Sequence, residues 1–264
     1  MRYITANRAQ PPPTTQCRAF HEMERLTSCS SRKWSPFPRT RHARAEFPVE
    51  CKFVHPWGPR EVHVPQFQIG KFAVTVGDYL NFANESGYAV AEQLRSDARF
   101  ENPQAPAAFV SWIDAVRYAQ WLARVSGKAY RLPRDAEYEK AARGGLMGKR
   151  FPWGVDPPDG RADFGNPQGA PKQVGSYAPY GYGIHDMAGS ICSWWEECYD
   201  QVVADDRARM CYDDTLIKDV RLNPICRGGS YKTALVESMY CAYRHEDPVD
   251  GRFDCIGFRL ALSA

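Results

Sequence analysis

The chain has 264 residues, of which 44% are hydrophobic, 25% charged and 13% aromatic. This composition is typical of a globular protein with an ample core, built as one large domain or two small ones. No apolar run approaches membrane-spanning length, and the start "MRYITANRAQPPPTT" lacks the apolar segment of a secretory signal. We therefore expect a cytoplasmic protein that does not insert into a membrane.

The net charge of +3 is distributed unevenly along the chain. Residues 1–60 contain eleven Lys or Arg and four Asp or Glu, whereas the remainder holds 23 basic and 27 acidic groups. We interpret residues 1–55, which are rich in Pro, Arg and Ser, as a basic N-terminal extension, and residues 56–264 as the folded domain. Such an extension is typical of a solvated arm or of an arm that contacts a partner, and both interpretations stay open.

The cysteines form no zinc-binding pattern. There are nine, at positions 17, 29, 51, 192, 198, 211, 226, 241 and 255. None belongs to a CxxC pair and no histidines cluster with them, so a zinc cage is not expected. Since no secretory signal is visible, we expect most of them to be buried or unpaired thiols, with disulfides as the alternative.

The first part of the chain predicts few regular elements. A short helix is expected around residues 19–26, "AFHEMERL". A strand pair is expected in residues 60–75, where β-branched and aromatic residues alternate with polar ones. A helix should follow, with Thr75 or Asp78 as its N-cap and Gly87 just beyond its end.

The clearest helical signals come next. In "VSWIDAVRYAQWLARVSGK", Ser111 and Asp114 have the spacing of a capping box, and Gly127 marks the end of the helix. A further helix is predicted in "RLPRDAEYEKAARGG", from Pro133 to Gly144. Beyond it the chain is dense in Gly, Pro, Asn and Asp, which predicts long ordered loops with short strands.

Several sequence blocks in order resemble one known family. They are "VSWIDAVRYAQWL", "YRLPRDAEYEKAARGG", "FPWG", "FGNPQG", "VGSYAPYGYGIHDMAGS", "RGGSY", "AYR" and "GFRLA". From about Pro59 to Ala261 the chain is similar to the sulfatase-modifying-factor family, that of the formylglycine-generating enzymes. The resemblance implies an α+β, C-type-lectin-like fold that is rich in loops, with two main helices and little regular sheet.

The resemblance also identifies where catalysis would take place. The oxidases of the family hold two cysteines just after the GGSY block, and the pair binds copper as thiolates, which suit soft Cu(I). The corresponding residues here are Thr233 and Ser238. We therefore expect no copper and no oxidase chemistry. The alternative is a rearranged metal- or oxygen-dependent site that uses Cys241, Cys255 or His245.

A calcium site is expected only from weak signals. Where relatives show a GNVWEW-like segment that helps to bind calcium, this chain reads "GSICSW" at residues 189–194. Oxygen atoms of Asp186 and Ser190 could still bind a hard cation. The acidic stretch "GVDPPDGRAD", residues 154–163, is a second candidate, although turn formation explains it equally well. Calcium therefore stays a candidate cofactor.

The loops near the C-terminus contain apolar residues where relatives have polar ones. Exposed apolar residues on adjacent loops are typical of a contact surface. We therefore predict a surface that binds a protein or other macromolecule. Its expected contact residues are Tyr231, Thr233, Leu235, Val236, Asp250, Phe253 and Asp254.

The chain has apolar loop residues between the sequence blocks RGGSY and GFRLA. This arrangement resembles that of the variable proteins of diversity-generating retroelements. In that family, templated mutagenesis alters selected codons near the C-terminus while blocks such as GGS and GFR stay unchanged. The resemblance implies a hypervariable binding surface at about residues 231–255. The alternative is that Leu235, Val236 and Phe253 simply pack beneath neighbouring loops.

Overall fold

The computed structural model describes residues 23–25, 64–146, 148–198 and 224–263. The helices are α1 (Val76–Ser86), α2 (Glu92–Ser96), α3 (Trp112–Ser126) and α4 (Asp135–Arg143), with 3₁₀ helices η2 (Ala98–Phe100) and η3 (Val236–Met239). The strands are β1 (Met23–Arg25), β2 (Phe67–Gly70), β3 (Tyr130–Arg131), β4 (Cys192–Cys198), β5 (Pro224–Arg227), β6 (His245–Glu246), β7 (Ile256–Phe258) and β8 (Ala261–Ser263).

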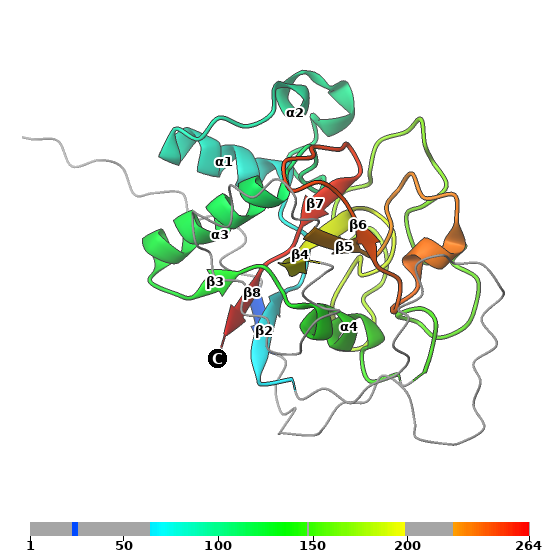
Figure 1. Cartoon of the computed structure of the whole chain (residues 1–264). Coiled ribbons are helices and arrows are strands. Elements are labelled where there is room, and N and C mark those ends of the chain that lie inside the picture. Colours follow the sequence, from blue (N-terminus) through cyan, green and yellow to red (C-terminus); the bar gives the residue numbers. More distant parts are fainter. Residues whose placement is uncertain (1–22, 26–63, 147, 199–223, 264) are drawn as a thin grey trace, which may run out of the picture.

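The strands form two small sheets. The first has the order β1-β2-β8-β3 and is antiparallel throughout. The second has the order β6-β5-β4-β7, in which β4 and β7 run parallel and the other pairs antiparallel. In Figure 1 helices α1 to α3 gather on one side of the molecule, and long loops on the other side lead into and out of the second sheet. The fold is thus α+β and rich in loops, as expected.

The three helices predicted after residue 75, which are α1, α3 and α4, are confirmed by their caps. The Ser111 side chain accepts from the Asp114 amide and the Asp114 side chain accepts from the Ser111 amide, which closes the capping box of α3. Helix α4 ends at Gly144, whose φ is 53°. A β-carbon at Gly144 would lie 2.3 Å from the Cα of Gly181, so this turn requires glycine for close contact as well as for its φ angle.

Two predictions for the first part of the chain are wrong. Within the segment expected to be helical, residues 23–25 form strand β1, and the rest of that segment lies outside the described residues. In the segment expected to hold a strand pair, the described residues contain one strand, β2, which pairs with β1 and β8 instead. Both errors have one cause, because local propensity does not indicate which distant segment a strand will pair with.

The hydrophobic core formed by the described residues has one large cluster and two smaller ones. In the large cluster the rings of α1 and α3 pack together, with Phe82 at 5.4 Å from Tyr118 and 5.2 Å from Trp121. A second cluster lies between α4 and strand β2. A third lies beneath η3, where Met239 packs with Phe151 and other residues. Each fully buried ring contributes roughly 2 to 3 kcal/mol.

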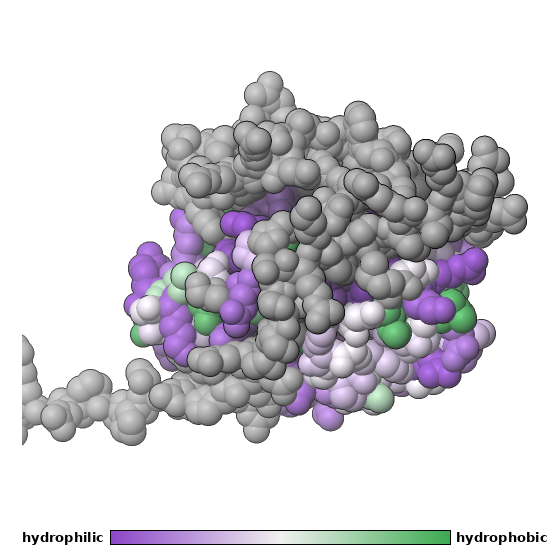
Figure 2. Space-filling model, turned by 90° about the horizontal axis from the view of Figure 1, so that it is seen from below, coloured by the Kyte–Doolittle hydropathy of each residue, from purple (hydrophilic) through white to green (hydrophobic). Residues whose placement is uncertain are grey.

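One face of the molecule (Figure 2) shows how polar and apolar side chains are distributed on the described surface. On the face shown in Figure 2, hydrophobic side chains of the described residues appear as separate small patches among hydrophilic ones. Within the described ranges no helix is long and apolar enough to span a bilayer.

Candidate functional site

Two neighbouring loops, residues 231–238 and 249–255, form the candidate site; we call them the site loops. The first follows a tight turn at Gly228 and Gly229, whose φ angles are 94° and 65°. A β-carbon on Gly229 would lie 2.9 Å from Cγ of Met239, so glycine is required beneath this loop. The RGGSY block therefore fixes where the first site loop leaves strand β5.

The backbone of the first site loop is held on both sides. The amide of Tyr231 donates to the carbonyl oxygen of Ser190 at 2.9 Å. The carbonyl oxygen of Tyr231 accepts from the Asn166 amide at 2.8 Å, and that of Thr233 accepts from the Gly165 amide at 2.9 Å. The loop is consequently ordered by the scaffold before any ligand binds.

The structure brings together the two positions that hold the copper thiols in the oxidases. Thr233 Oγ1 would lie 3.0 Å, and the backbone carbonyl oxygen of Ser238 3.4 Å, from a β-carbon on Gly229, so the backbone brings both residues beside this glycine. Thr233 Oγ1 accepts a hydrogen bond from the Ser230 amide at 2.8 Å, so this hydroxyl closes a turn of the loop. Neutral hydroxyls do not replace thiolates as ligands of Cu(I). The side chains at these positions therefore do not fit copper.

The second site loop is anchored to helix α3. Arg252 donates to both carboxylate oxygens of Asp114, at 2.7 and 2.9 Å. The Phe109 amide donates to the Phe253 carbonyl oxygen at 2.8 Å, and Phe109 adopts a φ of 53°, which is rare for a bulky residue. This strained residue and the ion pair fix the path of the loop.

An ion network joins the site loops. Lys232 of the first loop lies 2.9 Å from Asp254 of the second. Arg99 of η2 lies 2.9 Å from Asp254 and donates to the Tyr231 hydroxyl at 3.2 Å. Asp97 lies 2.6 Å from Arg99 on its other side. We call Asp97, Arg99, Asp254 and Lys232 the loop network.

The predicted contact residues divide between the surface and the interior. Leu235 is 69% and Phe253 37% exposed, and Asp250 is exposed as well. Val236 is half-buried and packs on the cluster beneath η3. Tyr231 is fully buried and bonded to Arg99, so it supports the surface from below and does not form part of it.

The remaining predicted contact residues, Thr233 and Asp254, are half-buried. Sequence reasoning missed three cations of the site, Arg99, Lys232 and Arg252. No local signal identifies Arg99, because its partners on the site loops lie 132 and 155 residues further along the chain.

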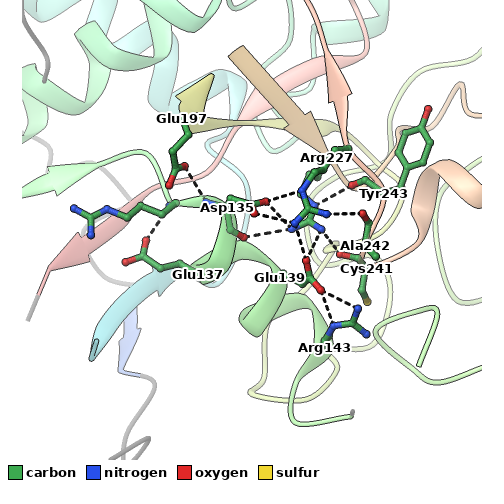
Figure 3. Close-up of polar contacts among 11 residues, drawn as sticks. Asp135, Glu137, Glu139, Arg143, Glu197, Arg227, Cys241, Ala242 and Tyr243 are labelled. Carbon is green, nitrogen blue, oxygen red and sulfur yellow. Dashed lines mark hydrogen bonds and ion pairs between the residues drawn. The ribbon is translucent and has the colours of Figure 1, made fainter. Parts of the chain in front are cut away.

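A buried arginine clamp joins helix α4 to the segment that follows η3 (Figure 3). Arg227 lies 2.9 Å from Glu139, and Arg244 lies 2.8 Å from Asp135 and 3.1 Å from Glu139. Arg227 also donates to backbone carbonyls of the segment, among them that of Tyr243 at 2.9 Å. We call Arg227, Arg244, Asp135 and Glu139 the arginine clamp. It holds the segment that follows the first site loop against α4.

The arginines of the clamp lower the pKa of the Glu139 carboxyl. Burial alone would raise the pKa of Glu139, but Arg227, Arg244 and Arg143 outweigh it and lower the pKa to about 2. The guanidinium of Arg227 also lies over the Trp195 ring at 4.4 Å. The charges of the clamp are therefore paired although they are buried.

The two thiols that the alternative hypothesis places in a rearranged site lie in different parts of the core. Cys241 belongs to the cluster beneath α4, and burial raises the pKa of its thiol to about 12. Cys255 packs on the large cluster, beside Cys192, and burial raises the pKa of its thiol to about 11. His245 pairs with Asp247 at 3.2 Å. Among the described residues, no three His, Cys, Asp or Glu side chains are arranged to hold a metal ion.

The calcium candidates close turns of the scaffold. Asp186 accepts from the Gly175 amide at 2.7 Å, and burial raises the pKa of its carboxyl. Ser190 is buried, and its carbonyl oxygen accepts from the Tyr231 amide at 2.9 Å. Asp163 of the second candidate stretch accepts from the Lys172 amide at 2.9 Å. Backbone amides thus already use one oxygen of each candidate.

Together, the loop-rich α+β fold, the glycine turn at RGGSY and the adjacent loops define a scaffold of the C-type-lectin-like class. Residues 41–264 match the family model described as "Sulfatase-modifying factor enzyme 1-like domain". The chain belongs to this family, as the sequence resemblance predicted.

Comparison with individual proteins gives the same fold and leaves the activity open. The formylglycine-generating enzyme of Streptomyces coelicolor is 36% identical over 194 residues, which are 66% of this chain and 57% of that protein. The chain thus spans little more than half the length of this relative.

Solved structures superpose on a larger share of this chain. PvdO from Pseudomonas aeruginosa superposes with a TM-score of 0.64 at 26% identity, covering 78% of this chain and 84% of that one. Treponema denticola variable protein 1 superposes with a TM-score of 0.63 at 19% identity, covering 82% and 92%, which shows a shared fold. Since the same fold occurs in a protein named as an enzyme and in one named as a variable protein, the site itself must decide between catalysis and binding.

Proposed function

We propose that this protein is a non-catalytic binding protein that presents its site loops to a protein ligand. The observation that carries the proposal is the chemistry of Thr233 and Ser238. The position where an oxidase holds its first copper thiolate has a hydroxyl that closes a turn of its own loop. This chain retains the scaffold of the family but lacks the pair of soft ligands that the oxidases of the family need.

The exposed side chains of the site loops favour a protein ligand. In the described part of the chain six large hydrophobic side chains are exposed, and two of them, Leu235 and Phe253, lie on the site loops. Two partly exposed arginines belong to the same region, since Arg252 precedes Phe253 in the chain and Arg99 pairs with Asp254, which follows it. Apolar and aromatic anchors combined with arginine are typical of residues that dominate protein interfaces.

The likeness to a protein named a variable protein supports a more specific hypothesis. The site loops are held by their backbones, by residues outside them and by a few of their own side chains, such as Lys232 and Arg252. Their other outward side chains, such as Leu235 and Phe253, can therefore change while the scaffold persists. We propose that these side chains are the hypervariable positions, as in the variable proteins of diversity-generating retroelements. A reverse transcriptase gene and a near-copy of the region encoding residues 227–260 beside this gene are expected. The absence of both contradicts this hypothesis but not the binding function.

Site-specific photo-crosslinking tests the binding function. A photoreactive amino acid replaces Leu235 in the full chain, and in a matched control it replaces Val125, which is 56% exposed on α3. In cells that express the protein naturally, we expect a discrete crosslinked partner from position 235 that is absent from position 125. The proposal is contradicted if the two positions give identical crosslinking patterns. It is also contradicted if the partner crosslinked from position 235 is still captured when Phe253→Asp is added.

The alternative is an oxidase with a rearranged cysteine site. The separate positions of Cys241 and Cys255 argue against it. Metal analysis of the purified protein tests it directly. Stoichiometric copper that is lost in Cys241→Ser would support the oxidase and contradict a function in binding alone.

A further inference from the structure

We propose that Arg99 is a positioning residue that couples the two site loops, so that the ligand surface is built from three chain segments, the third being η2. The inference deepens the proposed function and draws its significance from it, but its test uses the free protein. No feature of the loop sequences themselves points to this segment.

The guanidinium of Arg99 contacts Asp97 and both site loops at the same time. Its Nε and Nη2 atoms donate to the carboxylate of Asp97, at distances from 2.6 to 3.1 Å, which orients the guanidinium as a fork. Its Nη1 atom is then directed at both site loops, with 3.2 Å to the Tyr231 hydroxyl and 2.9 Å to Asp254. A single planar side chain therefore contacts one residue of each loop.

Asp254 completes the coupling from the second loop. One of its carboxylate oxygens accepts from both Arg99 and Lys232, at 2.9 Å each, and the other accepts from Lys232 at 3.1 Å. Burial would raise the pKa of this carboxyl, but the hydrogen bonds from Lys232 and Arg99 hold it below its ordinary value. Asp254 is consequently ionised at neutral pH and bridges the two cations.

The segment around η2 also supports the second loop indirectly, through Phe109. Phe100, which is buried, packs edge-on against Phe109 with ring centroids 5.4 Å apart. Phe109 in turn donates its amide to the Phe253 carbonyl oxygen at 2.8 Å. In Figure 1 the segment after α2 runs beside the loop that leads into β7. An ionic contact and a packing contact thus join η2 to the same loop.

Arginine is required for this role. Lysine would keep the charge but could not bond Asp97 with two nitrogens while another nitrogen reaches both loops. Because the four side chains of the loop network are only partly buried, their interaction is weaker than that of a buried ion pair. Loss of Arg99 should therefore loosen the loops without unfolding the domain.

Hydrogen–deuterium exchange of the full chain tests the coupling. In Arg99→Ala we expect amides of both site loops to exchange about tenfold faster, while those of α3 keep their wild-type rates. Arg99→Lys should give an intermediate increase. Arg95→Ala, an exposed arginine on α2, should change neither loop.

Three results would overturn the inference. They are unchanged exchange in the site loops of Arg99→Ala, faster exchange in one loop alone, and an equal increase in α3, which would mean that Arg99 serves global stability only. The photo-crosslinking experiment is independent of these rates. If it fails while exchange responds as expected, the coupling stands and the binding function falls.

Discussion

The arginine clamp and the loop network are built from the same kinds of side chain at different depths. Side chains of the clamp are between 1% and 13% exposed, whereas those of the loop network are between 17% and 32% exposed. Breaking a deeply buried ion pair leaves a charge that water does not reach, while a half-exposed charge is rehydrated. The clamp is therefore suited to hold the frame, and the loop network to hold a surface that can be altered at little cost.

The largest effect is expected from Arg227→Ala. Removing this cation leaves Glu139 and Asp135 with fewer partners in the protein interior, which should lower the free energy of unfolding by about 3 to 5 kcal/mol. Urea denaturation measures the loss. Arg161→Ala is the matched control, since it breaks a pair whose side chains are 40% and 61% exposed, and it should cost less than about 1 kcal/mol. Similar losses of unfolding free energy in the two variants would contradict the claim that the buried clamp stabilises the fold more than an exposed ion pair does.

Acid should weaken the arginine clamp by protonating Glu139. The pKa of Glu139 is about 2 in the folded protein, below its ordinary value of 4.5. A carboxyl whose folded pKa is depressed contributes stability that is present above its unfolded pKa and is lost as the pH falls from about 4.5 toward 2, here about 3 kcal/mol. Urea midpoints at several pH values in this window measure the loss. In Glu139→Gln this part of the pH dependence should disappear, and its persistence would contradict the assignment.

A smaller effect is expected from Arg252→Ala. The Arg252 side chain is 44% exposed, so solvent screens its pair with Asp114. Asp114 also keeps its bonds to the Ser111 amide and the Tyr88 hydroxyl. Thermal unfolding should therefore report a loss of about 1 kcal/mol. Arg124 is exposed on α3, the helix that carries Asp114, and Arg124→Ala should lower the free energy of unfolding hardly at all. Equal losses of stability in the two variants would contradict the anchoring role of Arg252.

The smallest effect on stability is expected at the surface itself. Leu235 is 69% exposed, so Leu235→Asp should change the free energy of unfolding by less than about 0.5 kcal/mol. The same variant should abolish the crosslinked partner when the photoreactive residue stands at Phe253. A large loss of stability would show that Leu235 is part of the core, as the alternative interpretation of the sequence holds.

Local signals were sufficient to predict α1, α3 and α4, but they missed α2 and placed a helix where β1 lies. The ends of α1, α3 and α4 follow from caps that lie within a few residues of each other, such as Ser111 with Asp114. The pairing of β1 with β2 and the role of Arg99 depend on contacts that no local pattern encodes. The family resemblance supplied the frame and the positions of Thr233 and Ser238, but it did not show that Tyr231 would be buried.

The central claim, a family frame that binds without oxidising, is tested most directly by turnover with copper present. The protein is incubated with Cu(I), oxygen and a cysteine-containing peptide, beside the variant Thr233→Cys/Ser238→Cys, and copper content and conversion of the peptide cysteine to formylglycine are measured. We expect no stoichiometric copper and no formylglycine with the natural chain, and copper binding in the double variant, because that variant restores the two thiols that suit soft Cu(I). Formylglycine produced by the natural chain would contradict the claim.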